Sequence, residues 1–147
     1  MDTAPDFFVS FTRDDIEWAR WITWVLEEEG FQVVFQELDM RPGHNIARQM
    51  QTGTSATRTI AVLSPAYTDR PFPLSEWAAA FVQDPDGLAR KLIPVRVEEC
   101  SPPGLLAPIV YIDLVGVERD EARQRLLSGI QSERPRVVAE PPFPGGR

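Results

Sequence analysis

Short apolar runs alternate with longer amphipathic segments along this chain, and the alternation restricts the fold more than any other feature. We expect strands at five stretches of near-continuous apolar character, namely 6–11, 31–36, 59–63, 91–97 and 109–114. Helical patterns and their end signals predict helices at 14–29, 46–55, 75–83 and 118–131. Because strands that alternate with helices are joined by right-handed βαβ crossovers, the sequence predicts a parallel sheet.

Glycine and proline mark the boundaries of these elements. Gly30 is predicted to close the first long helix. Pro94 has no amide hydrogen for a sheet ladder, so we expect its strand to be at an edge or irregular. The stretch 132–147 is rich in proline and glycine and has little to bury. We therefore predict one domain over 1–131 and a flexible tail or linker over 132–147.

Composition excludes several classes of function. A net charge of -7 argues against nucleic acid or anionic lipid as the main partner. No apolar run approaches the ~20 residues that cross a bilayer, so no membrane partner is expected. The start lacks a basic segment, and the single cysteine, Cys100, fits a reducing compartment, so we expect a cytoplasmic location. The one histidine, His44, cannot anchor a metal site alone, so neither metal nor cofactor is expected.

Three short segments occur in a fixed order, at or just after the ends of the first three predicted strands. They are Phe7–Phe11, Asp39–Gly43, and Leu63–Tyr67 with Ser75-Glu76-Trp77 beyond it. Each lies where a loop leaves the carboxyl end of a parallel strand, which is the edge where open α/β sheets bind ligands. The glycine patterns of dinucleotide-binding and P-loop proteins do not occur in the sequence. A response-regulator receiver is also rejected, because the third strand ends in Leu63-Ser64 without the aspartate that it requires.

Together, these segments resemble the conserved boxes of Toll/interleukin-1 receptor (TIR) domains. Phe7–Phe11, followed by Thr12-Arg13-Asp14-Asp15, is similar to the aromatic-rich first box, with Phe11 where tyrosine is usual. Asp39–Gly43 resembles the Pro-Gly turn of the BB loop, and Leu63–Tyr67 resembles the Leu-Ser-x-x-Tyr segment after the third strand. The resemblance covers residues 6–131. It implies a bacterial-type TIR domain with a flavodoxin-like three-layer α/β fold, in which helices flank a five-stranded, mainly parallel sheet.

TIR domains are either scaffolds or enzymes that cleave NAD+ between nicotinamide and ribose. The enzymes carry a glutamate on the helix after the third strand, four residues beyond an aromatic side chain. Here Ser64 leads to Phe72 and then to Glu76, twelve positions after the serine, with phenylalanine in place of the usual tryptophan. The resemblance thus implies an NAD+ glycohydrolase, with Glu76 as the catalytic carboxylate and NAD+ as substrate. The products would be nicotinamide and either ADP-ribose or a cyclic ADP-ribose.

A second register is possible. If Trp77 is the motif tryptophan, Phe81 takes the glutamate position and the domain is not an enzyme. We prefer the first register because it needs no insertion between Ser64 and the carboxylate. Pro71 and Pro73, which flank Phe72, depart from the family pattern.

The chemistry explains why a carboxylate is needed. Breaking a nicotinamide glycosidic bond passes through a state resembling an oxocarbenium ion, which a nearby carboxylate can stabilise. Ser75 is a good N-cap, so Glu76 is predicted in the first turn, where the helix dipole favours its ionised form. Acidic residues are also common in first turns for that electrostatic reason alone.

Further substrate-binding residues are implied by the same resemblance at the ends of the first and third strands: Phe11, Thr12, Arg13, Ser64, Tyr67 and Phe72. The guanidinium of Arg13 could bind a phosphate, or it could be a solvated charge beside two aspartates. Ser64 could bond the ligand, or it could cap its own turn.

Assembly is the remaining expectation. In TIR proteins the BB loop, here Arg41, Pro42, Gly43 and His44, often mediates self-association. Such enzymes become active in immune or defence signalling when an attached sensor, here expected beyond the tail, brings copies together. The alternative is a non-enzymatic scaffold that recruits other TIR domains through this loop. Trp18, Trp21 and Trp24 form a helical stripe, predicted either to pack in the core or to form a self-assembly surface.

Overall fold

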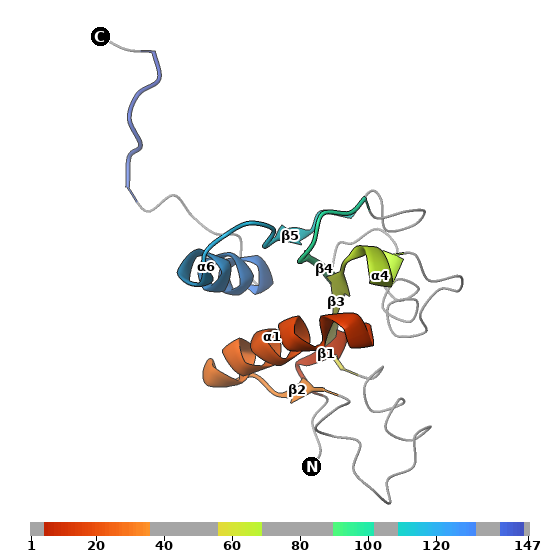
Figure 1. Ribbon diagram of the computed structural model, residues 1–147. Helices are drawn as coiled ribbons and strands as arrows, with labels where there is room; N and C mark the ends of the chain where they lie inside the picture. Colours follow the sequence, from red (N-terminus) through yellow and green to blue (C-terminus); the bar gives the residue numbers. More distant parts are fainter. Residues whose placement is uncertain (1–4, 36–55, 69–89, 102–108, 132–138, 146–147) are drawn as a thin grey trace, which may run out of the picture.

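The computed structural model describes residues 5–35, 56–68, 90–101, 109–131 and 139–145 (Figure 1). Within them the elements are, in chain order, β1 (Phe7–Ser10), the 3-10 helix η1 (Arg13–Asp15), α1 (Ile16–Glu28), β2 (Val33–Val34), β3 (Arg58–Leu63), α4 (Pro65–Thr68), β4 (Leu92–Arg96), β5 (Ile112–Asp113) and α6 (Arg119–Ile130). The predicted helices at 46–55 and 75–83 lie outside the described residues.

The described strands form one parallel sheet in the order β2-β1-β3-β4-β5. In register, Val9 lies opposite Ile60, and Ile60 lies opposite Ile93. Figure 1 shows α1 and α6 on one side of this sheet and α4 on the other. The structure is therefore a flavodoxin-like α/β fold with a five-stranded parallel sheet flanked by helices, as the sequence predicts.

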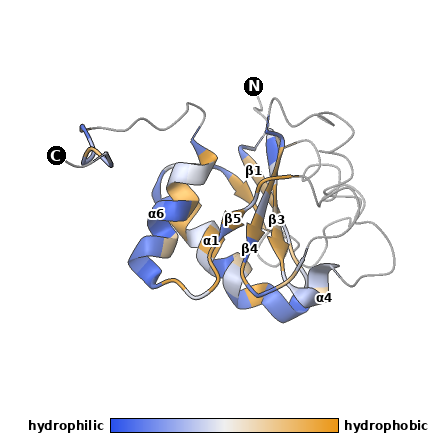
Figure 2. Ribbon diagram, turned by 90° about the horizontal axis from the view of Figure 1, so that it is seen from above, coloured by the Kyte–Doolittle hydropathy of each residue, from blue (hydrophilic) through white to orange (hydrophobic). Residues whose placement is uncertain are grey.

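Alternating side chains of the strands supply the two faces of the core. One face carries apolar residues of the three central strands, which pack under the buried side of α1 and α6: Phe7, Val9, Ile60, Val62, Ile93 and Val95. Helix α1 meets them through Ala19, Ile22, Val25 and Leu26. The opposite face carries Ala61, Leu63 and Leu92 with Tyr67 of α4. Figure 2 shows this apolar sheet between helices whose outer sides are hydrophilic.

Gly30 ends α1, as predicted from the sequence. Its φ is +91°, a left-handed conformation that favours glycine. The Gly30 amide donates to the carbonyl of Glu27 at 3.0 Å, and the Phe31 amide donates to that of Leu26 at 3.1 Å. This pair of bonds is a Schellman motif, which satisfies carbonyls at the end of the helix and turns the chain toward β2.

Two arginines hold the end of α6. Arg58, at the start of β3, donates to the carbonyl of Ile130 at 2.7 Å, and Arg90 donates to that of Gln131 at 2.6 Å. Burial is the main cause that lowers the pKa of Arg58 from its ordinary value. Both guanidiniums lie where the negative end of the helix dipole favours a cation, so they fasten α6 to the sheet.

The prediction that Pro94 marks an edge strand was wrong, because β4 lies between β3 and β5. The backbone of β4 explains how the strand accepts a proline. The carbonyl of Lys91 and the amide of Val97 bond to β3, whereas the carbonyl of Arg96 accepts the amide of Leu114, beyond β5. Backbone groups of successive residues in a strand point alternately to its two neighbours, so the nitrogen of Pro94 points toward β5. The ladder between β4 and β5 begins only at Val95. The missing amide hydrogen therefore costs no ladder bond.

The described part of the chain has no helix with the length and apolarity required to span a membrane. Residues 139–145 contain neither helix nor strand, and their side chains are exposed. The division into a domain over 1–131 and a flexible tail over 132–147 stays a prediction.

Candidate functional site

Five polar side chains form a buried network at the carboxyl ends of β1 and β3: Ser10, Thr12, Asp15, Ser64 and Tyr67. The hydroxyls of Ser10 and Tyr67 lie 2.9 Å apart. Thr12 donates its hydroxyl to Asp15 Oδ2 at 3.0 Å, and Ser64 donates its hydroxyl to the same oxygen. The network therefore joins the loop after β1 to the turn after β3, at the sheet edge where ligands bind in open α/β folds.

Ser10 and Asp15 are the two residues of this network that were not among the predicted site residues. Asp15 was considered only as one of two aspartates beside Arg13. In the structure it is 2% exposed, and its carboxylate bonds to a residue 49 positions away. The spacing of Thr12 and Asp15, Thr-x-x-Asp before an apolar run, is typical of a capping box, so it predicts a local helix cap and not the bond to Ser64.

The predicted substrate-binding residues that the structure describes differ in exposure. Thr12, Ser64 and Tyr67 are buried in the network, and Arg13 is exposed in η1. Phe11 is half-buried, with its ring 5.2 Å from that of Phe35. All five belong to segments at one sheet edge, but the hydroxyls of Thr12 and Ser64 are directed to Asp15. Their roles toward a substrate stay predictions.

Several predicted residues lie outside the described part of the chain. They are Glu76, Phe72 and Phe81 of the two possible registers, and the BB-loop residues Arg41, Pro42, Gly43 and His44. The assignment of the catalytic carboxylate therefore still rests on the sequence.

An ion-pair cluster occupies the ends of β4 and β5. Arg96 Nη2 lies 2.9 Å from Asp113 Oδ2, and Arg96 Nη1 lies 3.1 Å from Glu99 Oε1. The hydrogen bond between Arg96 and Asp113 raises the pKa of Arg96 and lowers that of Asp113. Nearby, burial is the main cause that raises the pKa of the Cys100 thiol. The Arg96 guanidinium also lies 5.0 Å from the centre of the Tyr111 ring, so its position is fixed by several partners.

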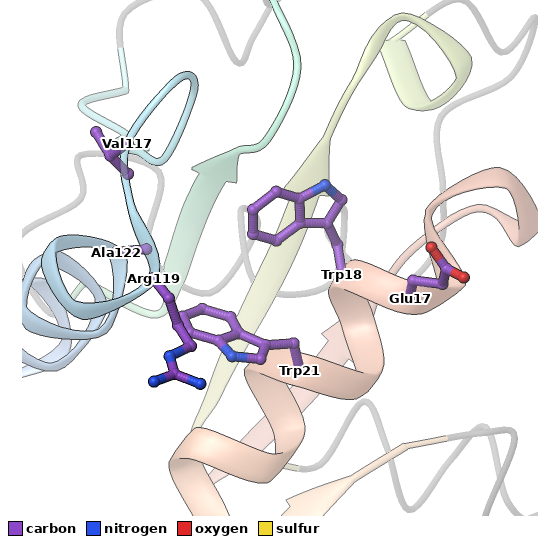
Figure 3. Close-up of a pocket in the computed structure, with 6 residues that line it drawn as sticks. All are labelled: Glu17, Trp18, Trp21, Val117, Arg119 and Ala122. Atoms are coloured by element: carbon purple, nitrogen blue, oxygen red, sulfur yellow. The ribbon is translucent and has the colours of Figure 1, made fainter.

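A pocket of about 490 Å³ lies between α1 and α6 (Figure 3), lined by Glu17, Trp18, Trp21, Val117, Arg119 and Ala122. Figure 3 shows the indoles of Trp18 and Trp21 projecting from α1 toward the segment that leads into α6. Their rings meet edge to face, with centroids 6.0 Å apart. Trp24 is 54% exposed. The tryptophan stripe therefore lies at the border of the core, and no predicted site residue lines this pocket.

Comparison with known proteins gives the family. The model of the TIR domain family matches residues 7–127, which include the polar network and the ends of all described strands. The chain belongs to the TIR domain family. Among curated proteins, no sequence matches this TIR domain.

Solved structures show the same fold. A metazoan TIR-STING receptor from C. gigas in complex with 2',3'-cGAMP is 24% identical over 91% of this chain, with a TM-score of 0.69. A second structure of a C. gigas TIR-STING receptor is 20% identical over the same share, with a TM-score of 0.67. This TIR domain spans 42% and 43% of those receptors, less than half of each.

A separate TIR domain gives a match over most of its own length. The TIR domain of the Toll-related receptor TRR-2 from Hydra magnipapillata is 23% identical over 75% of this chain and 84% of its own, with a TM-score of 0.58. At these identities the three likenesses establish the fold alone.

Proposed function

We propose that this TIR domain is an NAD+ glycohydrolase that is activated by self-association. The observation that carries the proposal is the place of Ser64 at the carboxyl edge of the sheet, with a glutamate twelve positions after it. That spacing is the pattern of the enzymatic members of the family. The edge is also where an α/β sheet of this kind binds nucleotides.

In the proposed reaction the bond between the nicotinamide nitrogen and C1′ of the ribose breaks. The bonding electrons leave with nicotinamide, and positive charge develops on the ribose ring. The ionised carboxylate of Glu76 stabilises that charge. Attack of a water oxygen on C1′, with loss of its proton, gives ADP-ribose, whereas attack by a nitrogen of the adenine gives a cyclic product.

The remaining proposed contacts surround the substrate. Arg13 is exposed in η1 and takes part in none of the ion pairs among the described residues, so its guanidinium can bind a phosphate of NAD+. Phe11, Tyr67 and Phe72 would shape the pocket around the bases. We expect no cofactor.

Self-association is part of the proposal, since TIR domains associate with one another. We propose that Arg41, Pro42, Gly43 and His44 provide contacts between copies, and that an attached domain brings the copies together in defence signalling. A scaffold without activity is the second candidate. The exposed indole of Trp24 on α1 supports it, because a large aromatic surface of this kind suits contact with a neighbouring copy.

A pair of variants tests whether Glu76 is the catalytic carboxylate. Glu76→Gln removes the charge at constant shape, and Glu28→Gln makes the same change at an exposed position of α1. With the protein clustered on a multivalent support, Glu76→Gln should lower nicotinamide release by roughly 100-fold or more, while Glu28→Gln retains it. Equal release from both variants would show that Glu76 is not the catalytic carboxylate.

A further inference from the structure

We propose that Asp15 is a positioning residue of this site, which fixes the turn after β3 against the loop after β1. The inference rests on the proposed function, because the turn leads along the chain to Glu76. It assigns a role to a residue that was not among the predicted site residues.

The first step is that Asp15 does not serve its own helix. It occupies the N-cap position of α1, where an aspartate ordinarily accepts a hydrogen bond from an amide of the first turn. Its side chain makes no such cap bond. The carboxylate instead accepts the hydroxyls of Thr12 and Ser64. A helix-capping role therefore does not explain this residue.

The second step concerns burial and charge. Asp15 is 2% exposed and Ser64 is 1% exposed. None of the ion pairs among the described residues includes Asp15. A buried carboxylate is costly to keep without a cation, and hydroxyl donors offset only part of that cost. Since neither side chain reaches solvent, Asp15 acts through the backbone that it holds.

The third step follows the bonds from Ser64 into the next turn. Its hydroxyl oxygen accepts the Tyr67 amide at 3.3 Å, and its carbonyl accepts the Thr68 amide at 2.9 Å. The orientation of Ser64 thus determines the path of α4. Because misplacing a catalytic group by about 1 Å can cost on the order of 100-fold in rate, this anchor should affect turnover more than substrate binding.

The test is a double-mutant cycle on kcat for nicotinamide release by clustered protein. We expect Asp15→Ala and Ser64→Ala each to lower kcat by about 10- to 100-fold, with KM changed by less than about threefold. The double variant should lose no more kcat than the less active of the two single variants, because both changes remove the same anchor. Asp15→Asn should recover most of the activity, since an amide oxygen can accept both hydroxyls.

Controls distinguish positioning from loss of stability. Leu126→Val alters the α6 side of the core, away from the network, and should leave kcat unchanged in the folded protein. Additive losses in the double variant, or an Asp15→Asn variant as inactive as Asp15→Ala, would overturn the positioning role. If Asp15→Ala does not fold, Asp15→Asn and Ser64→Ala decide the matter in the same assay.

A second measurement separates failure of this inference from failure of the proposed function. Amide hydrogen exchange at Tyr67 and Thr68 should be faster in Ser64→Ala and Asp15→Ala than in Leu126→Val. A wild-type protein that releases no nicotinamide but shows this exchange pattern would reject the enzyme and retain the anchor. Unchanged exchange at both amides would reject the anchor whatever the activity.

Discussion

The hydroxyl of Tyr67, in the turn after β3, lies 2.9 Å from the hydroxyl of Ser10 at the end of β1. Both residues are buried, and 57 positions separate them in the chain. The contact joins the first and third TIR boxes. It explains physically why a tyrosine in Leu-Ser-x-x-Tyr accompanies a serine at the end of the first strand.

Tyr67→Phe should therefore destabilise the domain by about 1–2 kcal/mol, because the buried Ser10 hydroxyl loses a partner. The measurement is urea unfolding followed by circular dichroism. Tyr111→Phe is the matched control, since the Tyr111 ring is only half-buried and contacts Arg96 through its face. Equal stability of Tyr67→Phe and wild type would contradict the role of this bond.

Thr23 gives a prediction of the opposite sign. Its hydroxyl is buried in α1 and has no hydrogen-bond partner within the part of the chain that the structure describes. Thr23→Val replaces the hydroxyl by a methyl group and should stabilise the domain by about 1 kcal/mol. Thr68→Val should give no such gain, because the Thr68 hydroxyl donates to the carbonyl of Ser64. The midpoints of urea unfolding test both, and a destabilised Thr23→Val would refute the prediction.

The ion pair at the ends of β4 and β5 makes stability depend on pH. The hydrogen bond from Arg96 lowers the pKa of Asp113 below its ordinary value of 3.8. In the folded state the carboxyl thus binds fewer protons than in the unfolded state. The resulting stabilisation is present above about pH 4 and is lost as pH falls through the lowered pKa.

Arg96→Gln should return the pKa of Asp113 toward its ordinary value and reduce this loss of stability in acid. Carbon NMR titration of the Asp113 carboxyl measures the shift directly. Arg119→Gln is the control, because that arginine is exposed and its ion pair with Asp120 is long, at 3.8 Å. An unchanged Asp113 titration in Arg96→Gln would assign the low pKa to another cause.

The sequence predicted the order of the strands and the long helices α1 and α6, because apolar periodicity and end signals are local, but it did not predict α4 or the separate 3-10 helix η1. Gly30 ended α1 as expected, and every strand except β3 proved shorter than its apolar run. Strand β5 covers Ile112–Asp113 where 109–114 was predicted, since ladder pairing with β4 limits its length. Pro94 was misplaced because its cost depends on which neighbour its nitrogen faces.

The polar network illustrates what local patterns do not contain. Ser64 was expected to bind ligand or cap its turn, and Asp15 was considered only as one of two aspartates beside Arg13. Their hydrogen bond spans 49 positions. It depends on the parallel pairing of β1 with β3, which brings the two loops to the same edge. Only the assembled sheet therefore shows that the first and third TIR boxes share one buried carboxylate.

Nicotinamide release is the most direct test of the proposed enzyme. We would incubate NAD+ with the wild-type domain, either dispersed or clustered on a multivalent support, and resolve the products by chromatography. We predict release of nicotinamide in step with ADP-ribose or its cyclic form, at a much higher rate for the clustered protein. A folded, clustered sample that leaves NAD+ intact would contradict the enzyme and favour a TIR scaffold.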